Sequence, residues 1–149
     1  MGVDKFKDAT AGEWKQDESP QQYWRGLYVF WQRTSPYPSM TIFDATSRER
    51  CAVKRDITST PLQALVLLND PVYVEASTAF ANRVTSHAVD FDERVTHMFA
   101  LALNRPPRKT ERAQFRQFYE TTMDAASAKD AWSQMAAVML NLDEVISIE

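Results

Sequence analysis

The stretch that decides the fold is Thr60-Pro61-Leu62-Gln63-Ala64-Leu65-Val66-Leu67-Leu68-Asn69-Asp70-Pro71. Thr60, followed by proline and then by Gln63 three residues on, forms a capping box that satisfies the free amides at a helix start. The apolar run 65–68 leaves almost no polar side. We therefore predict a short helix that is buried on all sides at the centre of the fold.

The same helix-start signal, a capping residue followed by an apolar repeat of helical period, recurs along the chain. Five further helices are predicted to follow Ser19, Asp70, Asp90, Thr110 and Ser127. The predicted apolar faces are Trp24, Leu27, Tyr28 and Trp31; Tyr73, Ala76, Phe80 and Val84; Phe91, Val95, Met98, Phe99 and Ala102; Phe115, Phe118, Tyr119 and Thr122; and Trp132, Met135, Ala136, Met139 and Leu140.

These elements predict an all-α chain. Residues 1–18 are polar and form a loosely ordered lead-in, and residues 19–149 form a single bundle-like domain of five to six helices. Between the first two predicted helices, the segment 35–59 begins with Ser35-Pro36-Tyr37-Pro38-Ser39. Its prolines disfavour a regular helix, so it is predicted as extended chain wrapped on the bundle, with a short strand pair around residues 51–53 as one option.

Composition excludes several classes of function. The chain has 149 residues and a net charge of −3, so no positive field attracts nucleic acid. The longest apolar runs are six residues, against about 18 for a membrane span. The N-terminus lacks a signal peptide, which taken alone predicts a cytoplasmic protein. One cysteine, Cys51, allows neither an internal disulfide nor a Cys-x-x-Cys-His haem site, so no cofactor is indicated.

A loop as long as 35–59 is uncommon in a compact domain unless it is functional, so a site is expected there first. Asp44 and Glu49, with Asp56, are candidate catalytic carboxylates for acid and base work on a glycan, which requires a separation of about 5–10 Å. In the structural alternative, Asp44 bonds turn amides and Glu49 pairs with a neighbouring arginine. That alternative is favoured.

The same loop holds a cluster of cations that is a candidate ligand site. Charge-assisted hydrogen bonds from these side chains suit a sulfate, a carboxylate or an anionic sugar, and a loop tyrosine offers an exposed aromatic face. Internal pairing with Glu49 and Asp56 is the favoured alternative. The candidate ligand-binding residues are Tyr37, Arg48, Arg50, Lys54 and Arg55.

Cys51 with His87 or His97 would be the minimum for thiolate catalysis, but a buried structural cysteine is favoured. The two histidines are ten residues apart on different predicted helices, not at the i, i+4 spacing that places two ligands on one helical face. No metal site is predicted.

Several motifs carry a family resemblance. Residues 27–34 (LYVFWQRT), Pro36-x-Pro38-Ser39-Met40, Phe43-Asp44-Ala45, Arg48-Glu49-x-Cys51, 60–70, 103–107 and 140–144 closely resemble the planctomycete-type domain of unknown function called the PSD family, found in large cytochrome-c-like proteins. The resemblance spans roughly residues 22–149, with departures at Ser47 and Ser59.

The resemblance implies the C-terminal part of a longer, extracytoplasmic (periplasmic) bacterial protein, with a haem-bearing module and another domain upstream. It transfers no catalytic residue. Three hypotheses for the function therefore remain. The first is a non-catalytic docking module that binds upstream domains or another extracytoplasmic protein. The others are a glycan- or anion-binding module and a fragment of an enzyme whose active site is completed by upstream residues.

Overall fold

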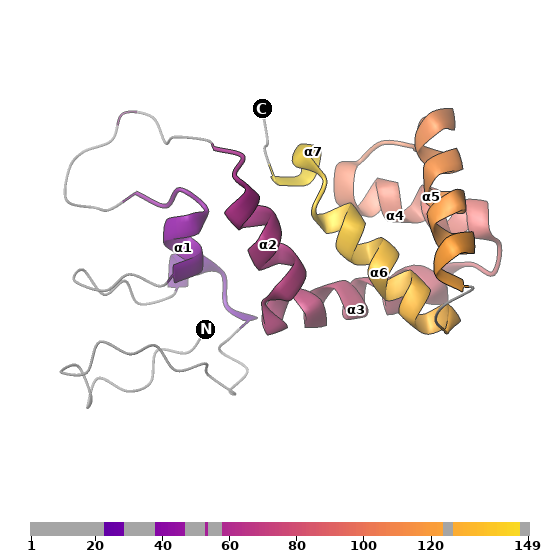
Figure 1. Ribbon diagram of the computed structural model, residues 1–149, viewed down its shortest axis with the longest axis horizontal. Coiled ribbons are helices and arrows are strands. Elements are labelled where there is room, and N and C mark those ends of the chain that lie inside the picture. Colours follow the sequence, from indigo (N-terminus) through magenta and orange to yellow (C-terminus); the bar gives the residue numbers. More distant parts are fainter. Residues whose placement is uncertain (1–22, 29–37, 47–52, 54–57, 124–126, 147–149) are drawn as a thin grey trace. The chain divides into compact units, whose positions relative to one another are not determined.

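The computed structural model describes residues 23–28, 38–46, 53, 58–123 and 127–146 (Figure 1). It divides into two compact units, residues 1–58 and 59–149. In the described residues all regular structure is helical, which confirms the all-α, bundle-like class. The elements are η3 Gly26–Tyr28, α1 Pro38–Ile42, α2 Pro61–Asn69, α3 Pro71–His87, α4 Phe91–Leu103, α5 Lys109–Met123, α6 Ala128–Leu140 and α7 Asp143–Ile146.

In the first unit, the predicted helix after Ser19 is wrong over residues 23–28, where no α-helix forms and Gly26–Tyr28 form the 3-10 turn η3. Gly26 lies in the middle of the predicted stripe, and glycine in a helix costs about 1 kcal/mol relative to alanine. Trp24 and Leu27, predicted on the buried face, are exposed. The remainder of that predicted helix lies outside the described residues.

The prediction that residues 35–59 are extended chain is wrong at Pro38–Ile42, which form α1. Proline is compatible with the first helical position, because its fixed φ suits a helix and its missing N–H has no partner to lose. Asp44, in the left-handed conformation with φ 56°, takes the chain out of this turn. Val53 lies in an exposed bend, not a strand, and Cys51 lies outside the described residues.

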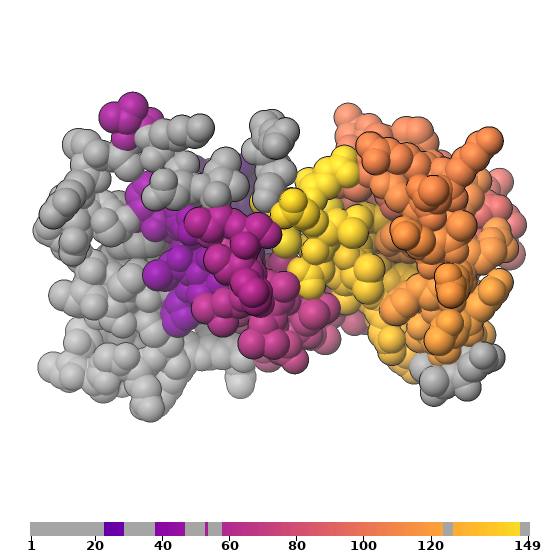
Figure 2. Space-filling model, turned by 45° about the horizontal axis from the view of Figure 1, so that its top comes forward, coloured from indigo at the N-terminus to yellow at the C-terminus, as the bar shows by residue number. Residues whose placement is uncertain are grey.

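The second unit is built around α6, which contacts α2, α3, α4, α5 and α7. Figure 2 shows α6 in yellow between α2 in magenta and α5 in orange. The inward residues of α6 repeat with helical period and are buried: Ala131, Trp132, Met135, Ala136 and Met139. The rest of the core comes from α3, α4 and α5: Ala81, Val84, Val95, Met98, Phe99 and Phe115.

Most predicted helix starts are confirmed. Thr60 Oγ1 accepts from the Gln63 amide at 3.3 Å, and Gln63 Oε1 accepts from the Thr60 amide at 3.0 Å. Asp70, Asp90 and Ser127 cap α3, α4 and α6.

The predicted cap at Thr110 is wrong, because α5 begins at Lys109, two residues earlier than a cap at Thr110 predicts. The Glu111 carboxylate accepts from the Arg108 amide at 2.6 Å, so Arg108 takes the cap position and its amide is satisfied from inside the helix.

The predicted central burial of α2 is also wrong. Leu62, Leu65 and Leu68 are 52%, 57% and 47% exposed, whereas the polar Gln63 is 2% exposed. The helix packs through one side against α3 and α6. The polar Gln63 side chain can be buried because its carboxamide oxygen accepts a hydrogen bond from the Thr60 amide.

Arg105, in the α4–α5 connection, joins α5 to α7. Its guanidinium makes a two-bond contact with Glu144, at 2.8 and 2.6 Å, and another with Glu111, at 3.0 and 2.8 Å. These hydrogen bonds raise the pKa of Arg105 and lower the pKa of both carboxyl groups, that of Glu111 to about 2. Arg105 also lies over the Phe99 ring at 5.4 Å, which ties this polar contact to the core.

None of the described helices has both the length and the apolar composition of a membrane span. The division into a lead-in over residues 1–18 and one domain over residues 19–149 stays a prediction.

We expect Met135→Ala to lower the free energy of unfolding by about 2–5 kcal/mol, because Met135 is 0% exposed and its truncation leaves a cavity. Val138→Ala, at a 37% exposed position of the same helix, should cost less than about 1 kcal/mol. Urea unfolding followed by circular dichroism measures both. Equal losses would contradict the central position of α6.

We expect Glu111→Gln to destabilise the protein at pH 7 by about 1–3 kcal/mol, the worth of a charge-assisted hydrogen bond. The pKa of Glu111 is depressed from 4.5 to about 2, so its contribution is full above 4.5 and is lost as pH falls toward 2. The difference between wild type and Glu111→Gln in urea unfolding should therefore shrink over that range. Glu120→Gln, an exposed change on the same helix, is the control; a pH-independent difference would contradict the Arg105 contact.

Candidate functional site

Of the residues predicted in the loop, Asp44 lies in the described part of the first unit. Its Oδ2 accepts from the Thr58 amide at 2.8 Å and from Thr58 Oγ1 at 2.7 Å. The carboxylate therefore joins two positions that lie fourteen residues apart in the sequence. This is a structural contact of the kind predicted as the alternative to catalysis, although the amide belongs to Thr58 and not to the adjacent turn.

The other predicted loop residues lie outside the described part of the chain, so their roles stay predictions. They are Tyr37, Arg48, Glu49, Arg50, Cys51, Lys54, Arg55 and Asp56.

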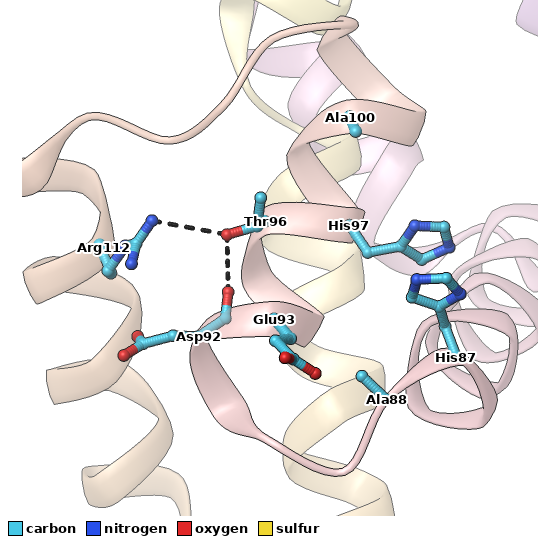
Figure 3. Close-up of a pocket in the computed structure, with 8 residues that line it drawn as sticks. All are labelled: His87, Ala88, Asp92, Glu93, Thr96, His97, Ala100 and Arg112. Atoms are coloured by element: carbon cyan, nitrogen blue, oxygen red, sulfur yellow. Dashed lines mark hydrogen bonds between the residues drawn. The ribbon is translucent and has the colours of Figure 1, made fainter.

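An open pocket of about 550 Å³ lies against one face of α4, with contributions from α3 and α5 (Figure 3). Six of its eight lining residues have polar or charged side chains. The lining residues are His87, Ala88, Asp92, Glu93, Thr96, His97, Ala100 and Arg112. None of these residues was predicted as a ligand-binding residue.

Two histidines from different helices meet at this pocket. His87 lies in the last turn of α3 and His97 lies on α4, and their rings stack with centroids 3.8 Å apart and planes 13° apart. Sequence spacing could not predict this pairing, because the turn at residues 88–90 brings the two helices together. No group of three His, Cys, Asp or Glu side chains gathers as metal ligands in the part of the chain that the structure describes.

The electrostatics of the pair favour a neutral imidazole at His97. Its pKa is lowered from 6.5 mainly by burial, and further by the neighbouring His87 and by the charge of Arg83.

On the opposite side of the pocket, two charged lining groups, Asp92 and Arg112, each have a hydrogen-bond partner. Asp92 accepts from Arg116 at 2.8 Å, and Arg112 donates to Thr96 Oγ1 at 3.4 Å. Thr96 in turn donates to the Asp92 carbonyl at 2.7 Å. The pocket thus offers acceptors and an imidazole, but no nucleophile lies beside a base among its lining residues.

The exposed face of α2 is a second candidate surface, of opposite chemistry. Leu62, Leu65 and Leu68 recur every third residue along this helix, and all nine residues of Pro61–Asn69 are uncharged. Contiguous exposed apolar residues are typical of a surface that binds another protein.

The described part of the chain is thus a small all-helical protein with a polar pocket and an apolar helix face, and with no assembled catalytic group among its described side chains. The chain belongs to the PSD1 family, described as a protein of unknown function (DUF1553), whose family model matches residues 1–119. No curated protein matches the chain, and no solved structure does.

We expect His97 to titrate below 6.5 in an NMR titration of the imidazole Cε1–H signals, for the reasons given above. His87→Ala should raise the pKa of His97, because it removes the stacked ring and the burial that this ring provides. Ser86→Ala, an exposed change one residue away, should leave it unchanged. A wild-type pKa for His97 at or above 6.5 would contradict the stacked arrangement.

Proposed function

We propose that this chain is a non-catalytic docking module that binds an apolar surface of a neighbouring domain through the exposed leucine face of α2. The observation that carries the proposal is the half-exposed row of Leu62, Leu65 and Leu68 on a helix without charge. In line with the family resemblance, the partner is an upstream domain of a larger, extracytoplasmic, cytochrome-like protein.

Exposure of this row has an energetic cost. Full burial of a leucine side chain is worth about 1.5–3 kcal/mol, so each half-exposed leucine forgoes about 1 kcal/mol. An isolated exposed leucine is ordinary, but three in one row on a short helix form a continuous apolar strip. Burial against a partner recovers this free energy.

Polar contacts at both ends of α2 hold the helix without using its exposed face. The capping box of Thr60 and Gln63 fixes its start. At the other end Asn69 Nδ2 donates to the Leu65 carbonyl at 2.8 Å. Near the middle of the helix, the Ala64 carbonyl accepts from Nδ2 of Asn141, the C-cap residue of α6, at 3.5 Å. The leucine row is therefore presented on a preformed helix, which reduces the ordering entropy lost on binding.

The chemistry of α2 restricts the partner. A surface without charge gives no attraction to a nucleic-acid backbone or to anionic lipid headgroups. It matches an apolar protein surface such as a groove between helices, which recognises leucines at three- and four-residue spacing.

The test titrates this chain with the separately expressed upstream domain of the parent protein by isothermal calorimetry. We expect Leu62→Gln/Leu65→Gln to weaken binding at least tenfold, since about 1.4 kcal/mol of lost burial gives that factor. The free energy of unfolding of this double variant should differ from that of the wild type by less than about 1 kcal/mol, because both leucine side chains are half-exposed.

Val89→Gln is the matched control, since Val89 is an exposed apolar residue outside α2. It should bind as the wild type does. Absence of binding by the wild type, or equal losses in the two variants, would exclude docking through α2.

A further inference from the structure

The corner between α3 and α4 is bridged by a pair of histidine side chains (Figure 3). His87 is the last residue of α3 and His97 lies on α4, and their rings stack with centroids 3.8 Å apart and planes 13° apart. His87 is exposed and His97 is half-buried, so both imidazoles can exchange protons with the solvent. Two groups that can each carry a positive charge therefore make this contact between the two helices.

The other polar contacts of this corner do not involve an imidazole. Arg94 Nε donates to the Ala88 carbonyl at 2.7 Å, and its Nη2 donates to the Thr85 carbonyl at 3.3 Å. The Asp90 carboxylate accepts from the Asp92 amide at 2.9 Å. Histidine is the side-chain type that ordinarily changes its charge between about pH 5 and 8. A change at this corner within that range is therefore expected to arise from the stack.

Charged groups from α3, α4 and α5 lie around the stack. Burial lowers the pKa of His97, and so do the neighbouring His87 and the charge of Arg83 on α3. Glu93 on α4 and Arg112 on α5 line the same pocket, and within the described ranges neither histidine makes a salt bridge. In that part of the chain, no bonded carboxylate offsets a positive charge on the pair.

The remaining neighbours contribute no further charge to the stack. Asp92 also lines the pocket, but its carboxylate accepts from Arg116 of α5 at 2.8 Å. Helix α2 is uncharged, and the buried residues of α6 have no titratable side chain. Helix α7 begins with Asp143 and Glu144, which do not line the pocket. The charge at the stack therefore depends on the two imidazoles and on the three charged neighbours named above.

We propose that the His87–His97 stack is a pH-sensitive contact that joins α3 to α4 and opens when both rings are protonated. Like charges this close together disfavour the doubly charged pair, and opening of the stack moves them apart. The bonds from Arg94 and the cap at Asp90 remain, so the opening is local and the unit stays folded. The proposal is independent of docking through α2.

The direction of the pH dependence follows from the linkage between protonation and opening. The pKa of His97 in the stack is below its ordinary value of 6.5, so the open form binds more protons once the pH falls below that value. The stack therefore makes its full contribution above 6.5, and this contribution is lost as the pH falls through the lowered pKa of His97.

The test follows the full chain by NMR between about pH 7.5 and pH 5, the range in which histidine titrates. A nuclear Overhauser cross-peak between the ring protons of His87 and His97 reports the stack. We expect this cross-peak at the higher pH and its loss at the lower pH. Amide hydrogen exchange of Ser86 and His87 reports local opening at the end of α3. Their protection factors should fall about fivefold, the effect of two unit charges about 4 Å apart in water.

His87→Gln removes one ring and should remove most of this pH dependence from the Ser86 amide, because a single imidazolium has no like-charged ring beside it. Glu93→Gln is the matched control, since it removes a titratable carboxylate from the same pocket and keeps both histidines. It should retain the pH dependence of the wild type. The core amide of Met135 should keep its protection in all three proteins, because the opening is local.

A cross-peak that persists at the lower pH, or equal pH dependence in wild type and His87→Gln, would overturn the proposal. Loss of the pH dependence in Glu93→Gln would also overturn it, because a carboxylate would then be the responsible group. An equal loss of protection at Met135 would show general unfolding in place of local opening. If His87→Gln fails to fold, as judged by circular dichroism, His97→Gln decides by the same criteria.

Discussion

Burial of one face of α6 is the constraint on which the second unit depends. Its inward positions follow the helical repeat from Ala131 to Met139, and each other helix of that unit packs against it. Three methionines, Met98, Met135 and Met139, are fully buried here. Their flexible side chains fill irregular gaps between helices that cross at different angles. The matched family segment ends at residue 119, before α6 begins, so the helices inside that segment complete their core with residues beyond it.

Two arginines beside this core bond to groups at the ends of helices and contribute little to the packed helix faces. Arg105 engages two carboxylates at the ends of α5 and α7 while its plane lies over Phe99. Arg94 binds two carbonyls at the end of α3 while it lies over Trp132. Arg94 thus satisfies carbonyls at a helix end that would otherwise bind water, whereas Arg105 bonds to carboxylates, and in both cases the guanidinium lies over an aromatic ring. The two differ in their partners, because Arg105 pairs with two acids, whereas the partners of Arg94 among the described residues are backbone carbonyls.

Local signals in the sequence predicted most of the helix caps, because a cap depends on a few neighbouring residues. The caps at Thr60, Asp70, Asp90 and Ser127 are correct because each is a contact over two or three residues. The predicted cap of α5 differs from the observed one because a glutamate inside the helix satisfies the Arg108 amide. The prolines of the loop predict extended chain, but Pro38 stands at the first position of α1, where a proline does not break a helix.

Contacts that depend on tertiary packing were not predictable in this way. An apolar run does not indicate which neighbouring helix covers it. The apolar run of α2 predicts a central position for this helix, whereas α6 is the helix that contacts all the others of the unit. The stacking of His87 on His97 depends on how α3 turns into α4. Of the candidate site in the 35–59 loop, Asp44 could be located, and its bond to Thr58 is the long-range contact that a local reading of turn chemistry does not give.

The leucine row of α2 has a physical reason to bind another surface. The described polar contacts of α2 are its capping box, the Asn69 side chain and the Ala64 carbonyl, so the exposed parts of the leucine side chains contact water, and only an apolar partner lowers their free energy. The same helix packs against α6, around which the second unit is built. The leucine row is therefore held in place by the core of the unit, and a partner that binds the row also stabilises the folded unit.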